Sequence, residues 1–501
     1  DWSDLIDLTY ALSPYTPDAS YVQAIRQRAN VEEWLRYFAF CNFVNYNESS
    51  LCNGVGDDYA LYRGINDTRF VIVAHDFDTI LGMGDGDYLP NTAASIWRAL
   101  ENVRGVGTTQ MANFLARFMR HNEFAPVYFK EYKRLLDTVF TPEVFNPTLD
   151  QLLGGWVSSA QIDPLKTFLI NRRAGVLSQF QTNYSVAVSL TQNAGYNYTT
   201  VSPISSITGF GNVFETRAVR LNGLPVTWTG WNGTWSATGV ALNPGLNRLL
   251  VQWLGENGVE IRRQTVEVWY DDTSVATVPT SIASDLTLTA AGGPYQASAN
   301  ITVQAGATLT IEPGTTVYFT AGMGLTVANN GRLLAEGTDV AGIRFSAVPG
   351  GANWGGLTVN GGTTSPETRI AYAHFSGNGS TAIHTADGTV FLDHLTFGNT
   401  AVQYLSLDRS SFVVQYCVFP NATAAFELVH GSGGIKSGGQ GMFLHNFFGR
   451  VNSYNDTVDF TGGNRPGPIV HFIDNVFTGS GDDILDLDST DAWIEHNIFL
   501  H

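Results

Sequence analysis

The sequence is poor in positive charge, in cysteine and in long apolar runs. Only 14% of its 501 residues are charged, the formal net charge is −18, and the lysines are few: Lys130, Lys133, Lys166 and Lys436. This acidic balance excludes a broad basic surface, so we expect no nucleic-acid partner. No apolar run reaches the roughly 18 residues that cross a bilayer, so we expect no membrane span within this fragment.

Cysteine is too scarce for a disulfide framework, because the chain has only Cys41, Cys52 and Cys417. Cys41 and Cys52 could pair, but buried thiols are the expected state. Glycine, with 52 residues, and aromatic side chains, at 12%, are abundant instead. With so little charge, this composition indicates a β-rich extracellular or cell-surface protein rather than a disordered one.

A phenylalanine returns at fixed intervals in the last third of the chain. The spacings are 22, 22, 29, 29 and 22 residues between Phe375, Phe397, Phe419, Phe448, Phe477 and Phe499. A repeat of this size with alternating β-branched residues and glycine-rich turns is typical of a β-solenoid. We expect a right-handed parallel β-helix over residues 276–501, with the extra seven residues of two coils projecting as loops.

The first 185 residues are predicted to be mainly helical. Apolar residues recur at helical spacing from Tyr21 to Phe43, Ala93 to Met119, Pro126 to Phe140 and Pro164 to Phe180. The long interruption at 45–87 contains two expected strands, Tyr59 to Arg63 and Arg69 to Ala74. These strands would bring Asp57, Asp58, Asp76 and Asp78 to one end, where carboxylates suit Mg²⁺. The alternative is that the acids cap a helix and solvate a turn.

The same segment resembles the signature of the spore-coat CotH kinase family. The resemblance rests on Gly56 to Tyr62, on Phe70 to Gly82, which includes His75-Asp76-Phe77-Asp78, and on Arg172-Arg173 in the closing helix. It implies an atypical protein-kinase fold whose helical lobe is present and whose N-lobe is missing, with Mg²⁺ and ATP as cofactors. The fragment alone should then be inactive, because a kinase lysine on the preceding lobe has no counterpart before Lys130.

The resemblance also implies roles for single residues. Asp76 matches the metal-binding aspartate, and Asp57 or Asp58 stands where the family has its second metal-facing polar residue. Asp57, Asp58 and Asp78 are the candidate cofactor-binding residues. The catalytic-loop aspartate has no clear match, because Asn45-Tyr46-Asn47-Glu48 occupies its place. Glu48 is therefore the candidate catalytic residue beside Asp76. The alternatives are that Asn47 takes this role or that the activity is lost.

Residues 186–275 are predicted to form a small β-sandwich that resembles immunoglobulin-like modules. Alternating apolar residues are punctuated by Asn222-Gly223, Asn232-Gly233 and Asn257-Gly258, which favour hairpin turns. A spacer role is the default. A sugar-stacking surface of Trp228, Trp231 and Trp235 is the alternative to packing in a core or between domains.

The predicted solenoid carries a possible column of acids. Eleven residues after the repeated phenylalanine lie Asp408, His430, Asp459 and Asp488, with the seven-residue insertions placed after this position. Asp482, Asp483 and Asp486 add to the patch. Carboxylates ~4.8 Å apart repel unless they bind a cation, raise a pKa or splay into water. Asp459, Asp486 and Asp488 are therefore candidate Ca²⁺ ligands, or the patch is a carbohydrate groove. A solvated acidic edge is the other interpretation.

Two further features of the repeat bear on function. Lys436, in a glycine-rich loop, could act as the base of a Ca²⁺-dependent lyase, whereas Asn446, Asn475 and Asn497 are expected to form a structural ladder. The chain starts without Met and stops at His501 in mid-coil, so we expect an interior piece of a longer protein.

Three function classes remain open. The first is a secreted or surface-attached multidomain protein with a CotH-like domain and a β-helix that recognises a polysaccharide or cell-surface protein. The second is a carbohydrate-active β-helix enzyme, and the third is a structural or adhesion protein without catalysis.

Overall fold

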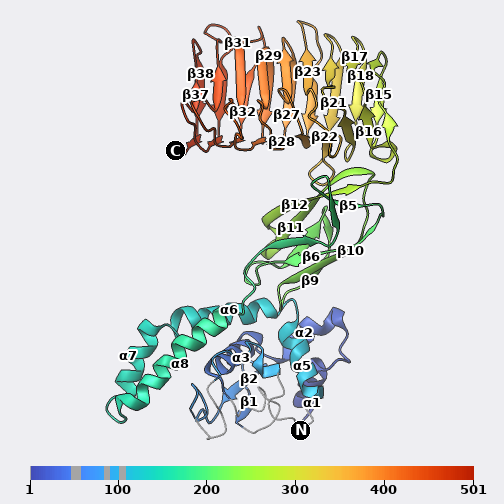
Figure 1. Cartoon of the computed structure of the whole chain (residues 1–501). Helices are drawn as coiled ribbons and strands as arrows, with labels where there is room; N and C mark the ends of the chain where they lie inside the picture. The colour runs from blue at the N-terminus through green and yellow to red at the C-terminus, as the bar shows by residue number, and fades with distance from the viewer. Residues whose placement is uncertain (1, 47–57, 84–90, 101–108, 501) are drawn as a thin grey trace.

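The computed structural model describes residues 2–46, 58–83, 91–100 and 109–500. Three parts follow one another along the chain (Figure 1). A helical part at the N-terminus is followed by a pair of β-sheets and then by a long parallel β-helix. The protein is mainly β, and none of the helices in these ranges is long and apolar enough to cross a membrane.

The helical part is built around α3, whose side chains are buried along most of its length. The helices and their bounds are α1 (Ser3–Leu12), α2 (Asp18–Arg28), α3 (Val31–Val44), the 3-10 turn η1 (Arg98–Leu100), α5 (Thr109–Arg120), α6 (Ala125–Thr138), α7 (Pro142–Leu153) and α8 (Ser159–Leu177). A core rich in aromatic rings joins them, and α3 packs mainly on α6.

The helix predicted from Tyr21 to Phe43 is wrong as a single element, because it breaks between α2 and α3. Ala29 is extended, and the Asn30 backbone N–H donates to the carbonyl of Phe70 at 3.0 Å. The Asn30 side chain then caps α3 by accepting from the N–H of Glu33. Pairing with a distant strand thus interrupts the helix at this point. The helical spacing of the apolar residues does not reveal this interruption.

The segment predicted as one helix from Ala93 to Met119 also differs. It contains η1 and α5 (residues 101–108 lie outside the described residues). The predicted helices at Pro126–Phe140 and Pro164–Phe180 are confirmed as α6 and α8. The helix α7 was not predicted, although Thr141 caps it and Pro142 occupies its first turn, the arrangement that usually starts a helix.

The middle part consists of two sheets whose apolar faces share one core, with Trp235 and Trp253 buried at its centre. One sheet has the order β3-β6-β10-β9 and the other β4-β5-β12-β11-β7-β8. Their strands are β3 (Ser185–Val188), β4 (Thr191–Asn193), β5 (Tyr196–Thr199), β6 (Ile204–Phe210), β7 (Ala218–Leu221), β8 (Leu224–Pro225), β9 (Thr227–Thr229), β10 (Thr234–Val240), β11 (Gly245–Leu254) and β12 (Glu260–Tyr270).

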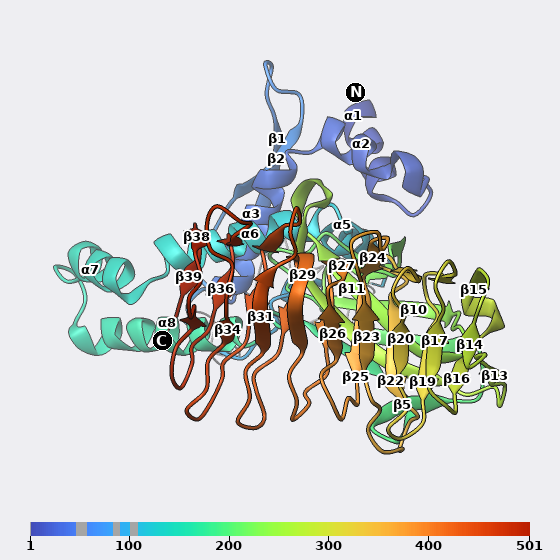
Figure 2. The same ribbon diagram turned by 90° about the horizontal axis from the view of Figure 1, so that it is seen from above.

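The β-helix has three strands in each coil and all of its strand pairs are parallel. One wall is a ten-stranded sheet, and the other two walls join into a seventeen-stranded sheet through the long strand β29, which belongs to both. Figure 2 shows the coils stacked side by side. The expected coil of about three short strands is therefore confirmed.

The ten-stranded wall carries the repeated phenylalanines. Its strands are β13 (Ala276–Thr277), β16 (Tyr295–Ala297), β19 (Thr316–Phe319), β22 (Ile343–Ala347), β25 (Ala373–Ser376), β28 (Thr396–Phe397), β30 (Val418–Phe419), β33 (Phe447–Phe448), β36 (Val476–Phe477) and β39 (Ile498–Phe499).

The two other walls alternate along the chain. The strands of the first are β14 (Ser281–Ile282), β17 (Ile301–Val303), β20 (Leu325–Val327), β23 (Leu357–Asn360), β26 (Ile383–Ala386), β29 (Leu405–Gln415), β31 (Val429–Ile435), β34 (Val458–Phe460) and β37 (Leu485–Asp486). The second comprises β15 (Leu286–Leu288), β18 (Thr308–Ile311), β21 (Arg332–Glu336), β24 (Thr368–Ala371), β27 (Thr389–Asp393), β29 again, β32 (Gly441–Leu444), β35 (Val470–Ile473) and β38 (Ala492–Glu495).

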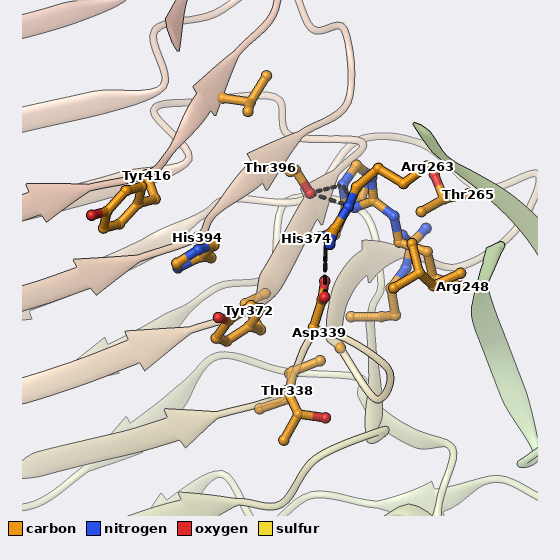
Figure 3. Close-up of a pocket in the computed structure, with 16 residues that line it drawn as sticks. Arg248, Arg263, Thr265, Thr338, Asp339, Tyr372, His374, His394, Thr396 and Tyr416 are labelled. Carbon is orange, nitrogen blue, oxygen red and sulfur yellow. Dashed lines mark hydrogen bonds and ion pairs between the residues drawn. The ribbon is translucent and has the colours of Figure 1, made fainter. Parts of the chain in front are cut away.

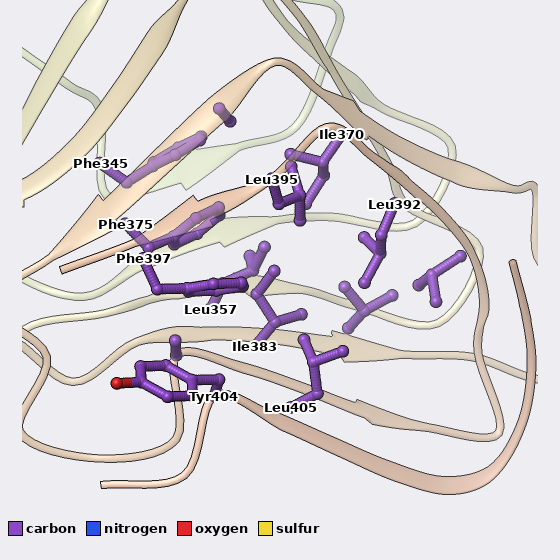
Figure 4. Packing of buried hydrophobic residues seen from close by; sticks show 14 of the residues in the cluster. Phe345, Leu357, Ile370, Phe375, Ile383, Leu392, Leu395, Phe397, Tyr404 and Leu405 are labelled. Atoms are coloured by element: carbon purple, nitrogen blue, oxygen red, sulfur yellow. The ribbon is translucent and has the colours of Figure 1, made fainter. Parts of the chain in front are cut away.

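Stacked side chains hold successive coils in register. The rings of Phe419, Phe448 and Phe477 lie 4.9 and 4.6 Å apart and within 4° of parallel. Figure 4 shows the earlier rings of the same file beside the aliphatic core. Asn446 donates to Asn475, which donates to Asn497, at 3.0 and 2.9 Å, so the expected asparagine ladder is confirmed.

Candidate functional sites

The first candidate site lies at the end of a hairpin in the helical part. Strands β1 (Tyr59–Arg63) and β2 (Phe70–Ala74) pair antiparallel with Tyr59 opposite Ala74. The residues just before β1 and just after β2 therefore meet, as the sequence predicts. Carboxylate oxygens of Asp58 and Asp76 and a ring nitrogen of His75 all lie within 4.8 Å of one another.

A buried tyrosine fixes the backbone of this site. Asp76 adopts the left-handed conformation, with a φ of 51°, which is uncommon for a residue with a side chain. The hydroxyl of Tyr46, a residue only 1% exposed, donates to the carbonyls of His75 and Asp76 at 3.0 and 2.7 Å. Unusual backbone geometry that its surroundings enforce is often found at binding sites.

The tyrosine itself is held by the end of α3, and a buried arginine braces that end. Arg172 on α8 is completely buried and donates to the carbonyls of Asn42 at 2.6 Å and Phe43 at 3.1 Å. It also donates to the carbonyls of Thr92 and Ala94. This residue of the predicted closing helix thus supports the site from behind and does not belong to it.

The predicted site residues have different outcomes. Asp58 and Asp76 come together as expected, and His75 joins them. Asp78 is exposed and lies outside this group of three. Glu48 and Asp57 lie outside the described residues, so their assigned roles stay predictions.

Two carboxylates on one hairpin end provide the oxygen ligands that Mg²⁺ takes from a protein when a nucleotide phosphate supplies the rest. Asp76 is exposed, which leaves it accessible to a ligand. The donor set therefore fits a Mg²⁺–phosphate complex, with His75 at its edge. The signals that sequence reasoning missed were His75, directly before the predicted metal-binding aspartate, and Tyr46, which is 30 residues from Asp76.

The second candidate site is on the β-helix wall that contains β31, β34 and β37. The predicted column is wrong in its register. His430 pairs with Ser406 and Asp459, and Asp459 pairs with Asp486, so Asp408 and Asp488 lie two residues further along their coils.

Insertion length explains this error. His430 and Asp459 each follow their phenylalanine by 11 residues, whereas Ser406 and Asp486 follow theirs by nine. Two of the seven extra residues of each long coil therefore precede the column, and five come after it. Asp408 forms an ion pair with Arg409 at 3.2 Å and does not join the acids.

Two acidic groups stand side by side on this wall. Nδ1 of His430 lies 3.0 Å from Oε2 of Glu427 and 3.2 Å from Oδ2 of Asp459. In the neighbouring group, ligand atoms of Asp456, Asp482 and Asp483 lie within 4.8 Å of one another. Glu427, Asp456 and Asp483 each precede a column residue by three positions, so they form a second file beside the column.

The electrostatics of the wall follow from this crowding. Burial raises the pKa of Asp486, and Asp488 and Asp456 raise it further. Burial is also the largest cause of the raised pKa of Glu427, followed by Asp459, while His430 opposes the rise. Groups that resist ionisation when crowded are stabilised as anions by a bound cation. Asp456, Asp482 and Asp483 offer only oxygen ligands, as Ca²⁺ prefers.

Lys436 does not face these acids. Its ammonium donates to the carbonyl of Gly362 at 2.5 Å, and the Thr389 hydroxyl lies 3.5 Å away, two coils back along the β-helix. The lysine thus ties coils together, which leaves no support for a role as a proton-abstracting base at the acidic wall.

The tryptophans of the middle part pack, as the default interpretation expects. Trp228 and Trp235 are 7% and 2% exposed within the core of the two sheets. Trp231 contacts Trp97 of the helical part edge-on at 5.9 Å, and Arg120 lies over its ring. None of these three forms an open stacking surface for sugars.

Comparison with protein-family models agrees with the predictions for the helical part and for the β-helix. Residues 1–190 match the family model described as CotH kinase protein. Residues 280–406 match the model of a pectate-lyase-like β-helix domain. The chain therefore contains a CotH kinase domain followed by a pectate-lyase-like β-helix, and the acidic wall lies beyond the second match. No curated protein and no solved structure matches the chain significantly.

Proposed function

We propose that this chain belongs to a secreted or cell-surface multidomain protein whose CotH kinase domain binds a Mg²⁺–nucleotide complex. The observation that carries the proposal is the meeting of Asp58 and Asp76 at one end of the β1–β2 hairpin. Bound Mg²⁺ would supply neutralisation of phosphate charge. The two carboxylates would orient the metal, and Tyr46 would keep the Asp76 turn in place.

The proposal is nucleotide binding and not phosphoryl transfer by this chain alone. A kinase uses a lysine on a separate lobe to contact the α- and β-phosphates. The sequence has no lysine before Lys130, which lies on α6. Glu48 remains the candidate for a catalytic role.

Calorimetric titration of the whole chain with Mg²⁺ and a non-hydrolysable ATP analogue tests this function. Asp76→Asn and Asp58→Asn should each weaken binding at least about tenfold, because each removes one of few charged ligands. The matched control is Asp67→Asn, at the opposite end of the same hairpin, where Asp67 pairs with Arg69. Equal binding by wild type and Asp76→Asn would refute the proposal.

The acidic wall supports a second function for the β-helix, which is Ca²⁺-dependent recognition of a polysaccharide or a cell-surface protein. Asp459 and Asp486 are direct neighbours in this wall, and Asp488 adds charge beside them. In this proposal the middle part is an immunoglobulin-like spacer. A glycan-binding assay with Ca²⁺ and with chelator tests this function. If neither the chelator nor Asp459→Asn changes the binding, the wall is only a solvated acidic edge, as in a structural or adhesion protein.

A further inference from the structure

A cavity lies where the middle part meets the β-helix, away from both sites described above. Its volume is about 230 Å³, far more than one ordered water needs. Strands β11 and β12 line one side, and the ten-stranded wall lines the other (Figure 3). The polar residues that matter are Arg248, Arg263, Arg344, His374 and Thr396.

Arg344 is the unusual member of this set. Its side chain is only 1% exposed, and its Nη1 donates to Oε1 of Glu267 at 2.7 Å. Its Nε and Nη2 are buried, and neither has a hydrogen-bond partner among the residues that the structure describes. Buried donors without acceptors are rare and costly in folded proteins.

The two unpartnered groups form one edge of the guanidinium. The Nε–H and Nη2–H bonds of arginine point in parallel, and this fork matches two oxygens of a carboxylate or a phosphate. Glu267 accepts a hydrogen bond only from Nη1 of Arg344, on the other side of the guanidinium. The chemistry that completes Arg344 is therefore an oxyanion that accepts two hydrogen bonds.

A second arginine adds charge without a counter-ion. Arg248 has no carboxylate within ion-pair distance in the described ranges of the chain, whereas Arg263 pairs with Asp339 at 2.9 Å. Burial lowers the pKa of Arg248, and Arg344 lowers it further, although Glu267 opposes this. The cavity therefore holds a guanidinium whose charge is poorly compensated.

The Nδ1 atom of His374, which faces Arg248, accepts a hydrogen bond and does not donate one. Arg248 Nη1 lies 3.3 Å from Nδ1 of His374 and 2.5 Å from Oγ1 of Thr396, and an arginine can only donate. Burial, then Arg344 and Arg248, lower the pKa of His374 well below its usual range. The ring is thus neutral and carries its proton on Nε2, which is a further donor.

We propose that this junction cavity binds an oxyanion group, either a phosphate or the carboxylate of an acidic sugar, held by the free edge of Arg344 and by Arg248. Tyr416 and Val418 also line the cavity and are 45% and 44% exposed, so its lining includes residues open to solvent. Because β11, β22 and β28 all contribute, the anion would also fasten the middle part to the β-helix.

Titration calorimetry of the whole chain with sodium phosphate, sodium sulfate and sodium glucuronate, at constant ionic strength against chloride, tests the proposal. Saturable binding of at least one of these anions is expected, and the tighter of phosphate and glucuronate identifies the source. Arg344→Lys should weaken it at least tenfold, because a lysine keeps a positive charge for Glu267 but lacks the fork. Arg248→Gln should weaken it similarly and provides a second variant should Arg344→Lys fold poorly.

The matched control is Arg369→Lys, since Arg369 pairs with Glu336 and Glu367 and does not line the cavity. This variant should bind like wild type. The proposal is overturned if none of the three anions binds, which would mean that the cavity holds only water, or if Arg344→Lys binds as tightly as wild type.

Discussion

Replacing Phe448 with alanine should loosen the β-helix locally and strongly. Phe448 is completely buried and its ring stacks on Phe419 and on Phe477 at 4.9 and 4.6 Å. A buried phenylalanine removes roughly 200 Å² from water, worth about 5 kcal/mol at 25 cal/mol per Å². Measured Phe→Ala losses in cores of about 3–5 kcal/mol agree with that figure.

Phe499 offers a control in the same file of rings. It is 46% exposed, so Phe499→Ala should cost only about 1–2 kcal/mol. Because coils contact mainly their neighbours, the loss at Phe448 should stay within the adjacent coils.

Hydrogen exchange measured by mass spectrometry reads out both effects. In Phe448→Ala, amides of β33 and β36 should exchange faster, while those of β17 and β20 should keep their wild-type rates. Unchanged exchange in β33, or equal losses in Phe448→Ala and Phe499→Ala, would refute the claim that stacked rings hold the coils together.

Three further predictions concern the two candidate sites. Arg172→Met should lower the free energy of unfolding of the helical part by at least about 3 kcal/mol, since buried carbonyls lose their donor, and denaturant unfolding with the exposed Arg134→Met as control measures this. Tyr46→Phe should cost about 1–2 kcal/mol and weaken Mg²⁺–nucleotide binding, measured by the same unfolding and by calorimetry, because the Asp76 turn loses its donor. The pKa of Asp486 is raised, by burial first, so the folded form binds more protons than the unfolded form. Stability in calcium-free buffer should therefore rise as the pH falls from neutral toward about 4, and Asp486→Asn should remove that part of the rise in melting temperature.

Each of these expectations has a contrary result. Wild-type stability of Arg172→Met would show that its carbonyl partners find other donors. Wild-type nucleotide affinity in Tyr46→Phe would show that the hydrogen bonds from Tyr46 to the Asp76 turn do not contribute to nucleotide binding. A pH dependence identical in wild type and Asp486→Asn would show that the crowding of the wall does not act through this carboxyl group.

The repeat was predictable because its cause is local. The spacing of Phe448, Phe477 and Asn475 is enough to predict that each coil places one phenylalanine ring in the core and one asparagine at a turn. The β1–β2 hairpin was equally visible, because an apolar strand leads directly into Asp76. Such features need no knowledge of which distant segments meet.

Features that depend on distant contacts could not be read in the same way. The α2–α3 break depends on Phe70, and the register of the acidic wall depends on how a loop insertion divides around the column. Arg344 meets Glu267 across 77 residues, and Arg248 meets His374 across 126. The periodicity of the sequence carries no information on side-chain contacts between residues so far apart along the chain.

The most direct test of the central claim is hydrogen exchange of the whole chain with and without Mg²⁺ and a non-hydrolysable ATP analogue. If Asp58 and Asp76 hold the Mg²⁺–nucleotide complex, exchange becomes slower in β1, in β2 and in the turn that carries Asp76, with the β-helix unchanged. Protection confined to the β-helix, or no protection anywhere, would contradict it.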